Sequence, residues 1–403
     1  MYVKALVLYL LAWITAAYQP MEFSEMKPDS DVGSEGSTLF FPIDGNVYPK
    51  GNYTVNISIG NPPKAYSLDI DTGSDLTWVT HVALSFFSKP PPNHYDPTKG
   101  SLVSCGDPDC KSLGNLGNND GMSPDAPCRY VADYADGGSS TGVLVRYSFP
   151  LTLRNGTTVT PQLAFGCGYH NKDEVSIHQP VNDGILGLGR GAPGILKQLS
   201  SMGVIRNVVG HCLSAQGGGY LFFGDIPIFG IVWKQISSDA EQYSLGSANI
   251  LLGGEATDIR GLEIIFDSGS TYTYLNSKAY GALLDLVTKN LNGLKDAVED
   301  TALPVCWKGE APIGSIDEVA SHFLPLAFNF TDEKNVQFQM DPKSYLIISE
   351  KGNVCFGILN GTKVGLKDLN VIGGISMQDK LVIYHNENER VGWAAVKTCN
   401  LKF

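Results

Sequence analysis

Two short motifs that each carry a carboxylate lie in the two halves of this 403-residue chain, D-T-G-S at residues 71–74 and D-S-G-S at residues 267–270. Each motif follows an apolar run with strand character. Each is also followed, more than a hundred residues later, by two apolar residues and a glycine, at 185–187 and 371–373. The repeated order predicts an internal duplication in which each half supplies one carboxylate.

The two carboxylates, Asp71 and Asp267, predict acid–base chemistry. Hydrolysis of an amide by water needs one group that takes a proton from the water and another that protonates the carbonyl oxygen. Two carboxylates a few ångströms apart supply both, because they cannot both ionise cheaply and so share one proton. One aspartate would be the base and the other the acid, and the sequence does not tell which is which.

The other motif positions carry residue types that would support such a pair. A glycine in the third position lets the backbone turn sharply and approach the opposite loop. Hydroxyls in the second position can lock the two loops together. Serines in the fourth position can donate to the outer carboxylate oxygens and help to keep one aspartate ionised. These supporting residues are Thr72, Gly73, Ser74, Ser268, Gly269 and Ser270.

A single D-[ST]-G motif would be weak support for catalysis, because Asp, Ser and Gly are common in ordinary turns at strand ends. Here there are two copies, and each has its own preceding apolar run and its own downstream apolar-apolar-Gly. The pattern as a whole favours the catalytic interpretation over the turn interpretation.

Longer motifs extend this pattern from about residue 53 to residue 393. They are D-T-G-S-D-L-T-W-V from residue 71, Y-A-D-G-G-S-S-T-G from 134, F-G-C-G from 165, D-G-I-L-G-L-G from 183 and G-H-C-L-S from 210. Together they resemble the pepsin-type (family A1) aspartic proteases, specifically the nucellin-like group from plants. Asp75, where animal pepsins usually have serine, fits the plant variant of the first motif.

The resemblance implies two aromatic site residues. Tyr134 would be the tyrosine of the flap hairpin, and Trp78 would be the tryptophan that hydrogen-bonds it. The alternatives are a strand tyrosine that packs on the sheet and an ordinary core tryptophan.

A third carboxylate, Asp69, should face the same side of its strand as Asp71, because residues two apart in a strand share a face. In the family this position borders the pocket for the residue before the scissile bond, so an acidic side chain there would favour a basic substrate residue. A hydrogen-bonded structural carboxylate is the equally weighted alternative.

The resemblance implies a mostly β, bilobal pepsin-like fold: two β-lobes related by a pseudo-twofold axis, with a few short helices. Short alternating runs bounded by Gly, Asn and Pro agree with it. Helical spacing is found only near residues 194–202 and 277–292. The predicted divisions are a signal peptide at 1–17, a short prosegment or disordered leader at 18–45, an N-terminal lobe at 46–228 and a C-terminal lobe at 229–403.

The composition and net charge of the chain limit the classes of partner that it can bind. A hydrophobic fraction of 43% suits globular cores, and the net charge of −12 disfavours nucleic acid and anionic membranes. Lys4, an apolar run over residues 5–17 and the small residues at 15–17 predict a secretory signal peptide that is too short to span a membrane. We expect a monomer without a membrane anchor, in the secretory pathway and then outside the cell, with the vacuole as the alternative.

Eight cysteines in an exported chain predict disulfides. The resemblance implies a bridge between Cys306 and Cys355 and leaves the other pairings open. The alternative role for the cysteines is a zinc site. The sequence contains no C-x2-C motif, so we expect no metal. The stretch 80–92 departs from the family because it lacks cysteines, so at least one of the three cysteines between residues 105 and 128 should lack its usual partner.

Candidate glycosylation sites are Asn52, Asn56, Asn155, Asn329 and Asn360.

The sequence therefore predicts an aspartic endopeptidase that hydrolyses polypeptides at acidic pH, binds pepstatin-like inhibitors and needs no cofactor. The alternative from another class is a catalytically silent binding protein, like the xylanase-inhibitor-like relatives that keep the fold. Such relatives usually have one damaged catalytic motif. Both motifs are whole here, which favours the enzyme.

Overall fold

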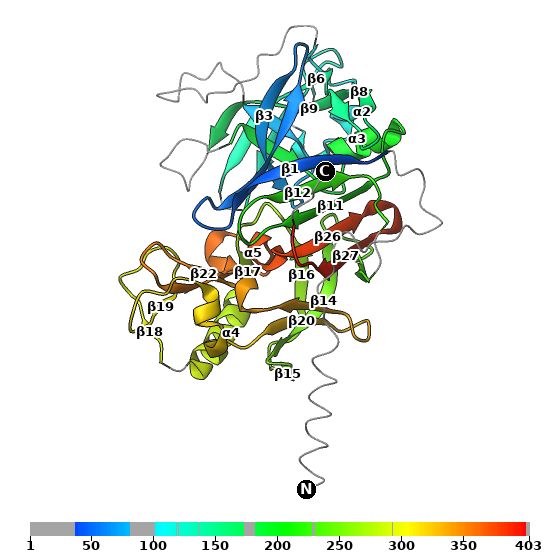
Figure 1. Ribbon diagram of the computed structural model, residues 1–403. Helices are drawn as coiled ribbons and strands as arrows, with labels where there is room; N and C mark the ends of the chain where they lie inside the picture. The colour runs from blue at the N-terminus through cyan, green and yellow to red at the C-terminus, as the bar shows by residue number, and fades with distance from the viewer. Residues whose placement is uncertain are drawn as a thin grey trace.

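The computed structural model describes residues 37–80, 101–172 and 182–399, apart from residues 118, 120, 136, 228, 229 and 292. Over these residues the chain is built mainly from β-strands, which form an upper and a lower lobe (Figure 1). The predicted fold class is confirmed. The predicted signal peptide and nearly all of the cysteine-free stretch lie outside the described residues.

The described strands form four sheets, and the largest sheet runs from one lobe into the other. Its strands, in spatial order, are β13 (Val232–Gln235), β27 (Arg390–Ala395), β26 (Lys380–His385), β11 (Val208–Leu213), β12 (Gly219–Phe223), β1 (Leu39–Asn46), β2 (Asn52–Ile59), β3 (Lys64–Asp71), β10 (Gly184–Gly187), β4 (Trp78–Thr80), β9 (Gln162–Lys172), β6 (Ser139–Ser148) and β5 (Arg129–Asp133).

The other sheets are smaller. The second contains β21 (Gln337–Met340), β20 (Leu326–Phe330), β14 (Ser244–Leu252), β16 (Leu262–Phe266), β25 (Asn370–Ile372), β17 (Thr273–Leu275) and β24 (Ile358–Asn360), with β15 (Glu255–Ala256) beside β14. The third contains β18 (Lys295–Asp296), β19 (Cys306–Lys308), β23 (Val354–Phe356) and β22 (Leu346–Ile348). The fourth pairs β7 (Leu151–Thr152) with β8 (Thr158–Val159).

The strands around the two motifs are paired in the same way in both halves. β3 ends at Asp71 and runs parallel to β10, and β16 ends just before Asp267 and runs parallel to β25. The strands that follow the motifs, β4 and β17, each pair antiparallel to β10 or β25 on one side and parallel to β9 or β24 on the other. The internal duplication predicted from the motifs is therefore present in the strand pairing.

The predicted leader at 18–45 is wrong for its last residues, 39–45, which form a strand. They belong to β1, which pairs with β12 on one side and β2 on the other. The apolar side chains of Leu39 and Ile43 are buried in the core. This short apolar run follows a long polar segment, so the sequence pattern did not indicate a strand. The strand forms because β12 and β2 supply hydrogen bonds on both sides.

The two lobes are joined more closely than the predicted division at residues 228 and 229 implies. β13, β26 and β27 come from the second half of the chain, yet β26 pairs with β11 and so extends the sheet of the first half. On β27, the buried ring of Trp393 stacks on Phe266 with 5.7 Å between ring centroids. Phe266 immediately precedes Asp267, so this core packing supports the second aspartate motif.

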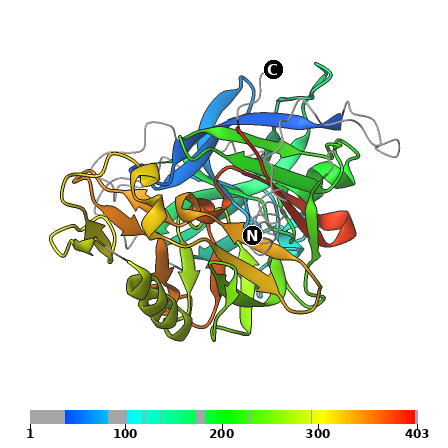
Figure 2. The same cartoon turned by 60° about the horizontal axis from the view of Figure 1, so that its bottom comes forward.

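The described α-helices are α2 (Pro108–Lys111), α3 (Ile195–Ser201), α4 (Ser277–Asn290) and α5 (Gly374–Met377). The helices predicted near 194–202 and 277–292 are confirmed as α3 and α4. Asn276 caps α4, since its Oδ1 accepts a hydrogen bond from Ala279 N at 3.0 Å. In both views α4 lies on the outside of the lower lobe (Figures 1 and 2). Among the described residues, no helix has the length and apolar character needed to cross a bilayer.

Three disulfides link six of the eight described cysteines. Cys306–Cys355 joins neighbouring strands β19 and β23, as the family resemblance implied. Cys212–Cys399 ties the end of the chain to β11, and Cys110–Cys128 lies beside the β5–β6 hairpin. Cys105 forms no disulfide, in agreement with the expectation that one cysteine of the insert region lacks a partner.

Candidate active site

The two aspartates meet where the motif loops of the lobes face each other. A Cβ added to Gly73 would lie 2.7 Å from Cγ of Asp267, and a Cβ added to Gly269 would lie 2.5 Å from Oδ1 of Asp71. Only glycine leaves room for such an approach. The two loops therefore bring the carboxyl groups of Asp71 and Asp267 close together between the lobes.

The second residues of the motifs lock the loops together by reciprocal hydrogen bonds. Ser268 N donates to Thr72 Oγ1 at 2.9 Å, and Thr72 N donates to Ser268 Oγ at 3.1 Å. Ser268 Oγ in turn donates to Ile70 O at 2.9 Å. Thr72 and Ser268 are buried, so water cannot replace these bonds. The interlock fixes the separation and orientation of the two aspartates.

The remaining motif positions hold each carboxylate by its two oxygens. Gly73 N donates to Asp71 Oδ1 at 2.8 Å, and Gly269 N donates to Asp267 Oδ1 at 2.9 Å. Ser74 Oγ donates to Asp71 Oδ2, and Ser270 Oγ donates to Asp267 Oδ2 at 2.7 Å. All eight motif residues selected from the sequence therefore lie together.

The charge state of the pair follows from its surroundings. Burial, and then the negative charge of Asp267, raise the pKa of Asp71 well above its usual range. The pair therefore holds a shared proton over a wide pH range. Because the folded protein binds this proton more tightly than the unfolded chain, the contribution of Asp71 to stability declines as pH rises from the ordinary to the raised pKa.

The two aromatic residues implied by the resemblance are in contact. Trp78 Nε1 donates a hydrogen bond to Tyr134 Oη at 2.6 Å. Tyr134 begins the turn between β5 and β6, where its N donates to Gly138 O at 2.8 Å. The hairpin position is that of a flap, and the role of Tyr134 in turnover is a prediction.

We expect Tyr134→Ala to lower turnover of long peptides by about tenfold or more while the melting temperature stays close to the wild-type value, because a closing hairpin orders substrate and excludes water. Tyr134→Phe is the matched control, since it keeps the ring and removes the hydroxyl that accepts from Trp78. Steady-state kinetics on one long peptide measure the effect. Unchanged kinetics for the alanine variant would place Tyr134 outside the cleft.

Asp69 lies near the pair, as strand alternation predicted. Burial, and then the charges of Asp71 and Asp267, raise its pKa well above the usual range. The side chain of Asn52 hydrogen-bonds the Asp69 carboxyl group, and Asn182 Nδ2 lies 3.5 Å from Asp69 Oδ2. These contacts are compatible with both the pocket and the structural interpretation of Asp69.

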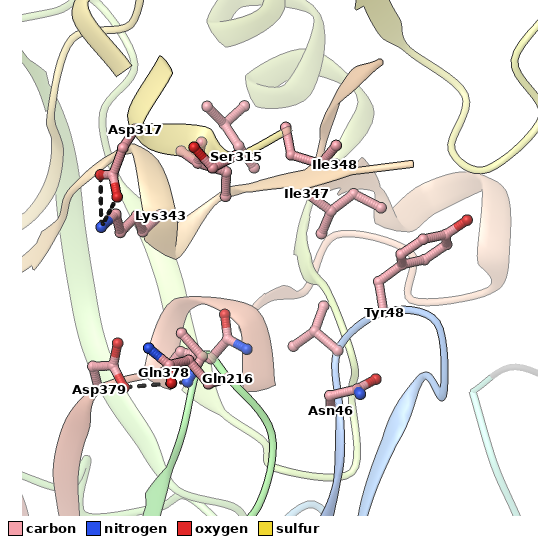
Figure 3. A pocket seen from close by; sticks show the side chains of 14 residues that line it. Asn46, Tyr48, Gln216, Ser315, Asp317, Lys343, Ile347, Ile348, Gln378 and Asp379 are labelled. Atoms are coloured by element: carbon pink, nitrogen blue, oxygen red, sulfur yellow. Dashed lines mark hydrogen bonds and ion pairs between the residues drawn. The ribbon is translucent and has the colours of Figure 1, made fainter. Parts of the chain in front are cut away.

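A separate hollow of about 340 Å³ lies at the seam between the lobes and contains neither catalytic aspartate. Figure 3 shows Ile347 and Ile348 on one side of it and Asn46 and Gln216 on the other. An ion pair between Lys343 and Asp317 lies at its edge. The hollow carries none of the acid–base chemistry described above.

One described cluster has metal-ligand atoms within reach of one another: Asp300, Cys306 and Cys355. Both sulfurs are joined in a disulfide, and the Asp300 carboxylate accepts a hydrogen bond from Asn353 Nδ2 at 2.7 Å. These three residues therefore serve the structure through a disulfide and a hydrogen bond, and their atoms are already engaged.

Comparison with known proteins agrees with this geometry. The N-terminal and C-terminal family models of the xylanase inhibitors match residues 53–225 and 241–395. An aspartic proteinase from rice (Oryza sativa subsp. japonica) is 42% identical over 373 residues, which cover 89% of this chain and 90% of the rice protein. The chain belongs to the pepsin-type aspartic proteinases. It is an aspartic-type endopeptidase.

More distant relatives share the fold. Aspartic proteinase 39 of Arabidopsis thaliana is 27% identical over 380 residues, which cover 87% of this proteinase and 75% of the relative. Basic 7S globulin from soybean superposes with a TM-score of 0.68 at 16% identity, over 89% of this chain and 96% of the globulin. The aspartic proteinase from Irpex lacteus superposes with a TM-score of 0.64 at 18% identity, over 90% of this chain and 98% of the Irpex protein. These two solved structures show the fold alone.

Some residues that contact the catalytic loops were missed in the sequence. Leu188 N donates to Asp71 O at 2.7 Å, and Thr271 Oγ1 donates to Gly51 O. The alternate glycines at 187, 189 and 191 were a usable signal for the first contact, because glycine spacing of this kind marks close backbone approach. The Thr271 contact links loops far apart in sequence and had no local signal.

Proposed function

We propose that Asp71 and Asp267 are the catalytic dyad of this endopeptidase, and that the enzyme cuts polypeptides at acidic pH after export from the cytoplasm. The observation that supports the dyad most strongly is the close approach of the two aspartate loops, which the reciprocal Thr72 and Ser268 hydrogen bonds hold together. No other described pair of carboxylates is held between the two lobes in this way.

The geometry supports a mechanism in which the pair carries one proton. The ionised aspartate accepts a proton from water as the oxygen of that water attacks the peptide carbonyl carbon. The other aspartate gives its proton to the carbonyl oxygen, which forms a neutral tetrahedral intermediate. The aspartate that took the proton from water then gives it to the amine nitrogen, while the other aspartate takes a proton from one hydroxyl of the intermediate and the C–N bond breaks. The acid and the amine are released, and the pair again carries one proton. Ser74 and Ser270 stabilise whichever carboxylate is ionised.

Several features support export. Three disulfides favour an oxidising compartment. Of the five sequons, Asn56 and Asn155 are exposed, whereas the other three are half-buried, so these two are the best-placed glycosylation candidates. We propose the extracellular space as the destination, with the vacuole as the alternative, and a monomer as the working form.

The second candidate function is a silent binding role, because the matching family models are named for xylanase inhibitors. Both motifs are complete here and both carboxyl groups meet, which supports the proteinase over this role.

A mixed peptide library, incubated at acidic pH with and without a pepstatin-type inhibitor, tests the proposal. We expect cleavage that the inhibitor removes. The absence of any inhibitor-sensitive cleavage across pH 3–6 would favour the silent binding role.

Asp69 provides a test of specificity. If Asp69 lines the pocket before the scissile bond and is ionised there, a Lys or Arg side chain that enters the pocket gains a charge-assisted hydrogen bond. Asp69→Leu should then shift cleavage from basic toward apolar residues, with modest loss of stability. Asp69→Asn is the matched control: it can keep contacts to Asn52 and Asn182 but loses the charge.

The structural interpretation of Asp69 predicts the opposite pair of results. Loss of the acceptor would leave Asn52 and neighbouring donors unsatisfied and lower the free energy of unfolding by about 1–3 kcal/mol. The cut sites would stay as in the wild type. Mapping of cut sites on one peptide mixture, with thermal melting of each variant, separates the two interpretations.

A further inference from the structure

A carboxylate outside the dyad, Asp75, holds the turn that follows β10. Asp75 is half-buried, and its Oδ1 accepts a hydrogen bond from Gly191 N at 2.8 Å. A Cβ added to Gly189 would lie 2.2 Å from Asp75 Oδ1, and a Cβ added to Gly191 would lie 2.1 Å from Asp75 Oδ2. The turn therefore closes around this carboxylate at van der Waals contact.

The glycines of the turn are needed for space and not for their backbone conformation. Gly187, Gly189 and Gly191 all lack the positive φ that favours glycine. At Gly191 the three atoms nearest to an added Cβ are all in the Asp75 carboxylate. The alternate glycines of G-L-G-R-G are therefore the positions at which Asp75 comes too close for a side chain.

The same turn is bonded to both ends of the first catalytic loop. Leu188 N donates to Asp71 O at 2.7 Å, and Gly189 N donates to Ser74 O at 2.8 Å. Tyr243 Oη donates to Leu188 O at 2.9 Å from the second lobe. A displacement of the turn would therefore move the backbone that carries the Asp71 carboxylate.

In the second lobe the segment after β25 also bonds its aspartate loop, at different positions and without a carboxylate. Gly374 N donates to Ser270 O at 2.7 Å, and Ile375 N donates to Thr271 O at 2.9 Å. Thr271 takes the place of Asp75 in the second motif, and its side chain bonds Gly51 O. The carboxylate support is therefore specific to the Asp71 side of the pair.

Charged groups from three elements face Asp75. They are Glu241, Lys197 of α3 and Arg190 of the turn itself. Burial is the main cause that raises the pKa of Asp75, and the hydrogen bond from Gly191 N opposes it. Arg190 is anchored by a bond from its guanidinium to Ala240 O at 2.7 Å.

We propose that Asp75 is a positioning residue for Asp71: it fixes the Leu188–Gly191 turn, and the turn fixes the first catalytic loop. In this role Asp75 would act through the turn, whose Gly191 N it bonds, and not on the reacting atoms themselves. The inference rests on the proposed dyad, and it concerns how the dyad is held in place.

The test compares kcat, KM and melting temperature of Asp75→Ala and Asp75→Asn, with active enzyme counted by titration with a pepstatin-type inhibitor. We expect Asp75→Ala to lower kcat by about tenfold or more with KM changed less than about threefold, because small displacements of a catalytic group slow the chemical step. Asp75→Asn keeps an oxygen that can accept from Gly191 N and should restore most of kcat. The matched control is Asp300→Ala, which removes a different carboxylate that holds a turn through backbone and side-chain donors outside the catalytic loops.

Gly191→Ala alone keeps the inference testable if Asp75→Ala folds poorly, and a double-mutant cycle adds a second test when both variants fold. Gly191→Ala forces a methyl group onto the Asp75 carboxylate and should lower kcat by itself, and combination with Asp75→Ala should relieve the clash, so the two losses should not add. Additive losses would overturn the inference. So would a kcat of Asp75→Ala per active site that equals wild type or falls no further than in Asp300→Ala. Absence of inhibitor-sensitive activity in the wild type would instead contradict the proposed function.

Discussion

Asp71→Asn and Asp267→Asn should each abolish peptide hydrolysis, with a loss of turnover of about a hundredfold to ten-thousandfold or more. Either change removes one of the two carboxyl groups that must share a proton. The structure gives no substitute, because each described motif loop presents a single aspartate to the other loop. Turnover of a susceptible peptide at acidic pH measures the effect.

The double variant Asp71→Asn with Asp267→Asn should be no worse than either single variant, because the two carboxylates act as one unit. Asp317→Asn is the matched control, since it makes the same chemical change at an exposed carboxylate outside the catalytic loops. Thermal melting should show that all four proteins are folded. A single asparagine variant that keeps more than a tenth of wild-type turnover would show that the dyad is wrongly assigned.

The second large effect is expected at the interlock between the lobes. Ser268→Ala removes the acceptor of Thr72 N and the donor to Ile70 O, all in a buried environment. Unsatisfied buried donors cost about 1–3 kcal/mol of unfolding free energy. A shift of the aspartates by about 1 Å would lower turnover by about a hundredfold. Denaturant unfolding and kcat report the two losses separately.

Thr72→Ser and Thr72→Val form the matched pair for this prediction. Serine keeps the hydroxyl that accepts from Ser268 N, whereas valine keeps the shape and removes the acceptor. Valine should reproduce the loss of Ser268→Ala, and serine should stay close to wild type. If valine were as active and as stable as serine, the reciprocal bonds would have no part in holding the dyad.

The meeting of Asp71 and Asp267 was predictable from the sequence because the same local motif occurs once in each half of the chain. Asp71 and Asp267 each follow an apolar strand and precede a glycine, and parallel pairing of those strands with β10 and β25 completes the symmetry. The contact between Asp69 and the pair followed from strand alternation alone. Its role in substrate choice did not, because the same carboxylate fits a pocket or a structural bond.

Features that depend on tertiary contacts were not accessible in the same way. Residues 39–45 were assigned to a leader, since a short apolar run gains strand structure only from the neighbouring β12 and β2. The extension of one sheet through both lobes by β26 was missed for the same reason. The support from Asp75 depends on a turn more than a hundred residues away, so its position in the motif alone did not reveal it.

The fold by itself does not decide activity. Basic 7S globulin from soybean superposes on this chain about as well as the aspartic proteinase from Irpex lacteus does. Function therefore has to be argued from the site, where both carboxyl groups and their supporting bonds are complete.

The pH dependence of kcat/KM between pH 2 and 9 tests the shared proton most directly. Below the active range the ionised carboxylate gains a proton and the base is lost. Above it the pair loses the shared proton and the acid is lost, and the raised pKa of Asp71 moves this second limb upward from the usual carboxyl range. We predict a bell-shaped profile centred below neutrality. A rate that still climbs between about pH 7 and 9 would show that another group is the base.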